Sequence, residues 1–248
     1  MCDSADFSRE PEDALNDIFI SYAHIDNEAL TEEDKGWISQ FHKVLDTRVA
    51  QLTGEKPRIW RDLKLGGNDV FDQAIEQQFS NARVMISIMS PRYLKSEWCM
   101  KELRQFYDNA SSSGGVSFEN KSRILKVVKT PFETNDVPNE IRSVFTSILG
   151  FEFFEVDPDT GKFNEYNATF GTEARHNYFS KIFDLAHEVS LLLKAMHNRE
   201  TGNGDSAISA AETKKIFLAT TTKDLQPEHD RIYRNLIERG YHIFPDQP

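Results

Sequence analysis

Short apolar segments alternate with amphipathic ones along most of the chain, and this alternation restricts the fold more than any other feature of the sequence. The predicted strands are 17–22, 57–62, 83–89, 124–128 and 151–156. The predicted helices run from Thr31 to Gly54, over 69–79, over 97–109 and from Glu173 onward. Strands that alternate with helices form a mostly parallel sheet covered on both faces. The sequence therefore predicts an α/β protein with an open parallel sheet.

The first predicted helix has both a start signal and a stop signal. Thr31-Glu32-Glu33-Asp34 has the spacing of a capping box, in which two side chains satisfy free backbone amides at a helix start. Apolar residues then recur at helical spacing up to Gly54, which is expected to end the helix. Further along, Ser111–Gly115 is predicted to be a flexible surface loop and 138–145 a short helix.

The last part of the chain repeats the beginning in outline. Ile18-Phe19-Ile20 corresponds to Ile216-Phe217-Leu218, and the segment at 59–62 corresponds to the one at 243–246. We expect an acidic, disordered tail at 1–16, an α/β domain at 17–198, a linker at 199–213 and a truncated second copy at 214–248. That copy amounts to one β-α-β unit, and an unrelated β-α-β addition is the alternative.

Charge and cysteine usage exclude several classes of function. The chain has 29 Lys and Arg against 40 Asp and Glu, a net charge of −11, so neither nucleic acid nor an anionic membrane surface is an expected partner. Its 2 cysteines, Cys2 and Cys99, have no zinc or disulfide spacing, which favours a reducing cytoplasm. We also expect no metal, no signal peptide and no membrane span.

Candidate functional residues follow the predicted strands, because parallel sheets bind ligands beyond the carboxyl ends of their strands. Ser21–His24 follows the first strand, Asp62–Phe71 the second, and Ser90–Glu102 the third. Trp98 and Glu102 are four residues apart, so they share one face of a helix. An indole beside a carboxylate suits a flat heteroaromatic ring attached to a sugar, although most such pairs are structural.

Three segments together resemble the signature segments of bacterial TIR (Toll/interleukin-1 receptor) domains. They are 17–23, Trp60-Arg61-Asp62, and above all 90–103, which reads SPRYLKSEWCMKEL. The resemblance covers about residues 17–190 and implies the flavodoxin-like TIR fold. It also implies that Glu102 is a catalytic glutamate preceded at i−4 by Trp98, as in TIR domains that hydrolyse NAD+.

By the same resemblance, further residues would line the substrate site: Tyr22, Ala23 and His24 after the first strand, and Asp62 and Phe71 after the second. Each also has a structural interpretation. Asp62 suits a turn before Gly66-Gly67, Phe71 suits a helix core, and His24 suits an exposed loop. Cys99 suits a small buried apolar site.

The predicted reaction is cleavage of the nicotinamide–ribose bond of NAD+, which gives nicotinamide and ADP-ribose or its cyclic form. NAD+ is then a substrate, and no cofactor is expected. Nicotinamide leaves as a neutral molecule, so one carboxylate is enough and no general acid is needed. The resemblance implies self-association through TIR domains and an immune or toxin role. The alternatives are a non-enzymatic TIR interaction module and a nucleoside 2-deoxyribosyltransferase-like enzyme.

Overall fold

The computed structural model describes residues 16–32, 35–61, 82–118, 121–133, 137, 142, 150–201, 215–238 and 241–244. The chain divides into two compact units, Met1–Glu200 and Thr201–Pro248, and each is described by itself. Residues 1–15 of the predicted tail at 1–16, the predicted helix over 69–79 and most of the predicted short helix over 138–145 lie outside the described residues.

A five-stranded parallel sheet forms the centre of the first unit. Its strands lie in the order β2 (Ile59–Arg61), β1 (Ile18–Tyr22), β3 (Val84–Met89), β6 (Ile124–Val128) and β7 (Phe151–Glu152). This is the flavodoxin-like strand order, so the predicted fold class is confirmed. The order reverses between β1 and β3, and parallel sheets of this kind bind their ligands at that point, beyond the carboxyl ends of the strands.

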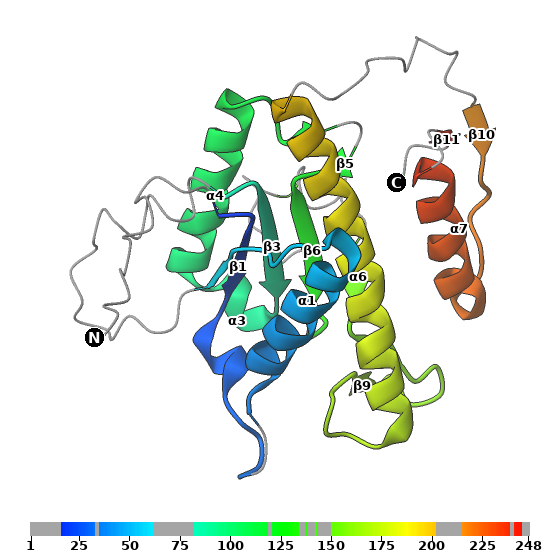
Figure 1. Ribbon diagram of the computed structural model, residues 1–248. Coiled ribbons are helices and arrows are strands. Elements are labelled where there is room, and N and C mark those ends of the chain that lie inside the picture. The colour runs from blue at the N-terminus through cyan, green and yellow to red at the C-terminus, as the bar shows by residue number, and fades with distance from the viewer. Residues whose placement is uncertain are drawn as a thin grey trace, which may run out of the picture. The chain divides into compact units, whose positions relative to one another are not determined.

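Helices cover both faces of the sheet, as Figure 1 shows. On one face lie α1 (Trp37–Thr53) and α6 (Thr172–Glu200), and on the other lies α4 (Glu97–Ser112), preceded by the single turn α3 (Pro91–Leu94). Every residue of β1 and β3 is buried, because a strand covered on both faces has no solvent side. Ile18, Ile20 and Tyr22 pack towards α1 and α6, whereas the alternate residues of β1 pack towards α4.

The first helix begins later than the sequence predicts. Gly36, not Thr31, is its N-cap, and Trp37 is its first residue. The cap is supplied from a distance: the Asn27 carboxamide oxygen accepts a hydrogen bond from the Ser39 amide at 2.8 Å. Gly36 has φ of 80°, and a Cβ atom there would lie 2.2 Å from the Asn27 carbonyl oxygen. The capping-box prediction is therefore wrong, because a tertiary contact with the 3-10 turn η1 (His24–Asn27) fixes the helix start.

Two later boundaries also differ from the prediction. The predicted strand 151–156 is two strands that are separated by Phe153, whose amide still donates to the Val128 carbonyl of β6 at 2.9 Å and whose ring packs against Trp37 and Tyr178. The following strand β8 (Phe154–Val156) pairs with β9 (Phe163–Glu165) in an antiparallel hairpin. The predicted loop at 111–115 begins as helix, since α4 continues to Ser112 and the hydroxyls of Ser111 and Ser112 donate to the preceding turn. A second small hairpin, β4 (Ser117–Phe118) with β5 (Lys121–Ser122), follows α4.

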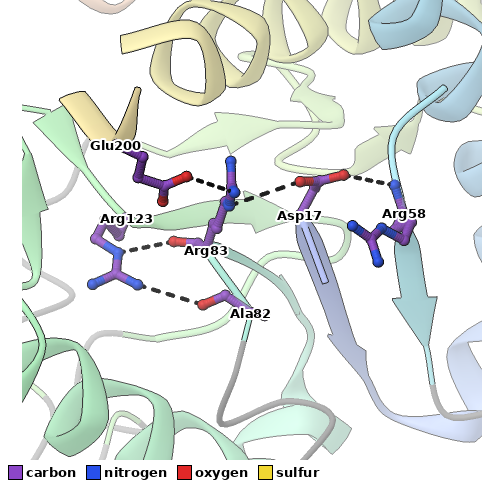
Figure 2. Close-up of polar contacts among 6 residues, drawn as sticks. All are labelled: Asp17, Arg58, Ala82, Arg83, Arg123 and Glu200. Carbon is purple, nitrogen blue, oxygen red and sulfur yellow. Dashed lines mark hydrogen bonds and ion pairs between the residues drawn. The ribbon is translucent and has the colours of Figure 1, made fainter. Parts of the chain in front are cut away.

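Charged side chains connect the segments at the amino-terminal ends of the strands, here called the amino-terminal edge of the sheet, as Figure 2 shows. Asp17 accepts the Arg58 backbone amide at 2.9 Å and lies 3.9 Å from Arg83 Nε, and Arg83 in turn contacts Glu200 at 2.8 Å. The buried Arg123 guanidinium donates to the carbonyl oxygens of Arg83, Gly115 and Ala82. The Glu200 contact holds the last residue of α6, which runs two residues into the predicted linker 199–213, whose positions 202–213 lie outside the described residues.

The second unit has the β-α-β form that its sequence predicts. Strands β10 (Lys215–Phe217) and β11 (His242–Phe244) pair in parallel, with Ile216 opposite Ile243. Helix α7 (Gln226–Glu238) connects them after the short 3-10 turn η3 (Lys223–Leu225). Its interpretation as a truncated second copy of the first unit stays a prediction.

Candidate functional site

A buried carboxylate lies beside the carboxyl end of β1. Glu102, on α4, is only 3% exposed, and two side chains donate hydrogen bonds to it. The Ser21 hydroxyl donates to Oε2 at 2.5 Å, and the Trp98 indole donates to Oε1 at 2.7 Å. The two donors come from different elements and bond to different oxygens of the carboxylate. Hydrogen bonds to a charged acceptor are stronger than neutral ones, so this pair stabilises Glu102 as an anion and fixes its orientation.

Helix α4 holds Glu102 in this position through its start and its buried face. The Ser96 hydroxyl caps the helix by accepting the Cys99 amide at 3.3 Å. Cys99, Leu103 and Phe106 on the same helix are almost fully buried in the cluster that packs on the sheet. The spacing of four residues between Trp98 and Glu102 brings the indole and the carboxylate into contact, as the sequence predicts.

The hydrogen-bonded chain continues past Ser21 into the core. The Ser21 Oγ atom lies 3.1 Å from the hydroxyl of Tyr93, which is fully buried on α3. Burial raises the pKa of Tyr93 well above its ordinary value, and the Cys99 thiol adds to this effect. Tyr93 is therefore neutral at physiological pH and acts as a hydrogen-bonding group, not as a base.

Cys99 touches the same site but is chemically inert. Its thiol lies 3.5 Å from the Tyr22 carbonyl oxygen, and burial, followed by the nearby Glu102 carboxylate, raises its pKa to about 12. A thiol with that pKa carries almost no thiolate at neutral pH, so it is a poor nucleophile. The interpretation of Cys99 as a small buried apolar residue agrees with this environment.

A second carboxylate, Asp26, lies where β1 and β3 end. Its Oδ2 accepts the Ser90 hydroxyl at 2.6 Å, and the same hydroxyl oxygen accepts the Tyr93 amide as the N-cap of α3. Burial raises the pKa of Asp26, and the Ser90 hydrogen bond opposes that rise. Asp26 therefore links η1, after β1, to the start of α3, after β3, across the point where the strand order reverses.

The structure brings only some of the sequence-predicted residues together. Glu102 and Trp98 are in contact, and Ala23 belongs to the buried cluster on the α4 side. Tyr22 packs with the α1 and α6 cluster, and His24 is exposed, with its ring 5.6 Å from that of Tyr22. Asp62 and Phe71 lie outside the described residues. The substrate-binding role of each of these residues stays a prediction.

Ser21 and Tyr93 lie within the candidate segments Ser21–His24 and Ser90–Glu102, but the sequence did not single them out as site residues, and Asp26 lies outside all three candidate segments. A signal for Ser21 was present, since alternate residues of a strand share one face and Ser21 is the polar residue between Phe19 and Ala23. Ser21 also pairs in register with Ser87 on β3, so two buried serines lie side by side in an apolar sheet. Tyr93 and Asp26 gave no such signal, because their contacts depend on how α3 and η1 fold back.

Two further properties concern the described residues alone. They contain no group of three or more His, Cys, Asp or Glu side chains placed to hold a metal ion. None of the helices in this part of the chain, including the long α6, is apolar enough over a sufficient length to span a membrane.

Comparison with known proteins gives a family match and a likeness to solved structures. Residues 18–118 match the family model described as the TIR domain. The solved TIR domains of the activated Roq1 resistosome, which directly recognises the pathogen effector XopQ, align at 10% identity and a TM-score of 0.33. That alignment covers 75% of this chain and 99% of the Roq1 TIR chain, and a TM-score this low has no bearing on function. A search of curated proteins gave no match.

Proposed function

Since residues 18–118 form part of a TIR domain, we propose that this chain cleaves the bond between nicotinamide and ribose in NAD+, with Glu102 as the catalytic carboxylate. The observation that carries the proposal is the environment of Glu102: a buried carboxylate that accepts the Ser21 hydroxyl and the Trp98 indole. A structural glutamate on a helix surface is ordinarily solvated, and burying a charge without need is costly.

The chemistry requires a fixed negative charge more than it requires proton transfer. As the glycosidic bond breaks, nicotinamide takes the bonding electrons and leaves neutral, while positive charge develops on the ribose. A carboxylate held by two donors stabilises that charge without reorganising, and a low-dielectric site strengthens the effect. Attack by water then gives ADP-ribose and one proton, whereas attack by a ring nitrogen of the same molecule gives the cyclic product.

The neighbouring side chains support Glu102 as the acting group. The Cys99 thiol, with a pKa raised to about 12, is not a competing nucleophile. Tyr93 stays neutral and contacts Ser21, so it holds the serine that orients the carboxylate. Trp98 contributes an indole next to Glu102, which suits a flat pyridinium ring.

The burial of Glu102 adds a condition to the proposal. At 3% exposure the residue is covered in the described arrangement, so substrate can reach it only after its surroundings rearrange. We propose that self-association through TIR domains supplies this rearrangement, because a packed interface can offset the cost of ordering the site. Activity then depends on assembly.

The deciding experiment replaces Glu102 by Gln and follows the release of nicotinamide from NAD+ by chromatography. Gln has the same shape, and its carboxamide oxygen can still accept the Trp98 indole while its amide nitrogen donates to the Ser21 hydroxyl, so the fold is retained while the charge is lost. We expect a loss of about 10²–10³ in rate, the size found when one electrostatic stabiliser of a transition state is removed. Glu97→Gln is the matched control, since Glu97 is exposed at the start of the same helix.

Two outcomes would overturn the proposal. Equal nicotinamide release by the parent chain and Glu102→Gln would remove Glu102 from the chemistry. No release at any protein concentration would favour the non-enzymatic TIR module. Base exchange on a deoxynucleoside in the same assay would instead indicate the deoxyribosyltransferase-like reaction.

A further inference from the structure

A positively charged groove lies between α1 and α6, on the face of the sheet opposite to α4. It has a volume of about 500 Å3, and its lining includes Lys35, Lys43 and Arg48 but no aspartate or glutamate among the described residues. None of the three cations forms a salt bridge within the part of the chain that the structure describes. The groove lining is therefore positively charged, although the net charge of the chain is −11.

Two phenylalanines one helical turn apart form the α6 side of this groove. The rings of Phe179 and Phe183 lie 6.5 Å apart, and Phe183 is 43% exposed although it is a large apolar side chain. The Arg48 guanidinium lies 4.7 Å above the Phe183 ring, and Arg175 lies 5.8 Å from the ring of Phe179. Each aromatic ring is therefore paired with a cation, an arrangement that is favourable when desolvated.

Arg48 is held in place before any ligand arrives. Its Nη1 donates to the Gln51 side chain at 3.1 Å, and its guanidinium carbon lies over the Phe183 ring. A preorganised guanidinium loses less conformational entropy when it binds an anion than a freely rotating one does. Lys43, Thr47 and Gln51 follow one another at intervals of four residues, and Arg48 lies three residues before Gln51, so all four line the groove from the same side of α1.

We propose that this groove binds a small phosphorylated compound that carries a flat ring, the chemical class of nucleotides. Its volume lies within the range of small-ligand sites. The arginine fork and the lysines suit phosphate oxygens, whereas the phenylalanine edges suit an unsaturated ring. A polyanionic macromolecule fits less well, because the overall negative charge of the chain repels it. The inference does not depend on the proposed cleavage of NAD+.

The test measures binding of AMP, adenosine and inorganic phosphate to the full chain by titration calorimetry. We expect AMP to bind saturably. Adenosine, which lacks the phosphate, and inorganic phosphate, which lacks the ring, should each bind at least about tenfold more weakly than AMP. Arg48→Gln and Lys43→Gln should each weaken AMP binding about tenfold, the loss of one charge-assisted contact. Lys56→Gln is the matched control, since Lys56 is an exposed cation near the end of α1 that lies outside the groove.

The effect of Arg48→Gln on AMP binding decides whether the groove is the nucleotide site. AMP binding that Arg48→Gln and Lys43→Gln leave unchanged would place the nucleotide elsewhere on the chain and overturn the proposal. Absence of saturable AMP binding would overturn it too, as would binding of an acidic peptide but not of AMP. A change in oligomeric state in Arg48→Gln without a change in AMP binding would likewise overturn it, because a second copy would then occupy this face. Phe183→Ala, checked by thermal unfolding, gives a second test, because it should weaken AMP binding without affecting inorganic phosphate.

Discussion

Replacing Ser21 by Ala tests whether its hydroxyl stabilises a charged carboxylate. The Ser21 hydroxyl donates to Glu102 at 2.5 Å inside the core. A hydrogen bond to a charged group contributes about 1.5–3 kcal/mol to stability, against about 1 kcal/mol for a neutral pair. The change from Ser to Ala leaves almost no cavity. We therefore expect Ser21→Ala to lower the free energy of unfolding by about 2 kcal/mol.

A double-mutant cycle with Glu102→Gln isolates the contribution of the charge. In the Gln background the carboxamide oxygen faces the Trp98 indole, so the Ser21 hydroxyl accepts a neutral hydrogen bond from the amide nitrogen. Removal of the hydroxyl should therefore cost about 1 kcal/mol less than in the parent chain. The lost contact between Ser21 and Tyr93 is common to both backgrounds and cancels. Ser87→Ala is the control, because Ser87 is the buried partner of Ser21 in register on β3.

The assay is urea unfolding followed by tryptophan fluorescence. The 3 tryptophans, Trp37, Trp60 and Trp98, all belong to the first unit, so the signal reports that unit without interference from the second. Equal losses for Ser21→Ala in the two backgrounds would show that the charge on Glu102 has no part in the contact. A loss below about 0.5 kcal/mol in the parent would refute the reasoning as a whole.

Three further predictions follow from the same structure. Gly36→Ala should lower the free energy of unfolding in urea more than Gly54→Ala does. Both glycines have a positive φ, but an added Cβ meets the Asn27 carbonyl at Gly36 and nothing within 4 Å at Gly54. Equal losses in the two variants would contradict this prediction. Burial raises the pKa of Asp26 above its ordinary value of 3.8, so the folded chain binds the carboxyl proton more tightly than the unfolded chain does. The folded chain therefore loses stability as the pH rises from the unfolded pKa through the folded pKa. The advantage of Asp26→Asn over the parent, measured by unfolding across pH, should therefore grow from about pH 4 upwards, and a constant or shrinking advantage would be inconsistent with this cause. Finally, the specific activity of NAD+ cleavage should rise with protein concentration and with a crowding agent, together with light scattering; a flat specific activity from a monomer would exclude assembly as the switch.

The sheet could be predicted from the sequence because its signal is local. Runs such as Ile18–Tyr22 and Val84–Met89 are apolar at every position except one serine each, Ser21 and Ser87, and such near-continuous apolar runs are typical of strands covered on both faces. The contact between Trp98 and Glu102 was predictable for a similar reason, since a spacing of four residues determines which helical side chains meet.

The remaining features depend on contacts between distant parts of the chain. The start of α1 is fixed by Asn27, which lies before the predicted capping box. Phe153, between β7 and β8, packs its ring against Trp37 and Tyr178, which are distant in the sequence. Asp26 meets Ser90 only once β1 and β3 are neighbours. None of these pairings has a periodic pattern in the sequence, so spacing alone could not reveal them.

The charged network lies at the amino-terminal ends of the strands, so substitutions there can change the stability of the fold without touching the site around Glu102. Asp17, Arg83 and Arg123 act where the strands begin, while Ser21 and Glu102 meet where β1 ends, about 13 Å further along a five-residue strand. Substitutions that improve the amino-terminal edge would raise the melting temperature without altering the carboxylate. A chain with that added stability would stay folded when destabilising substitutions are made around Glu102, so that their effects could be measured in a folded protein.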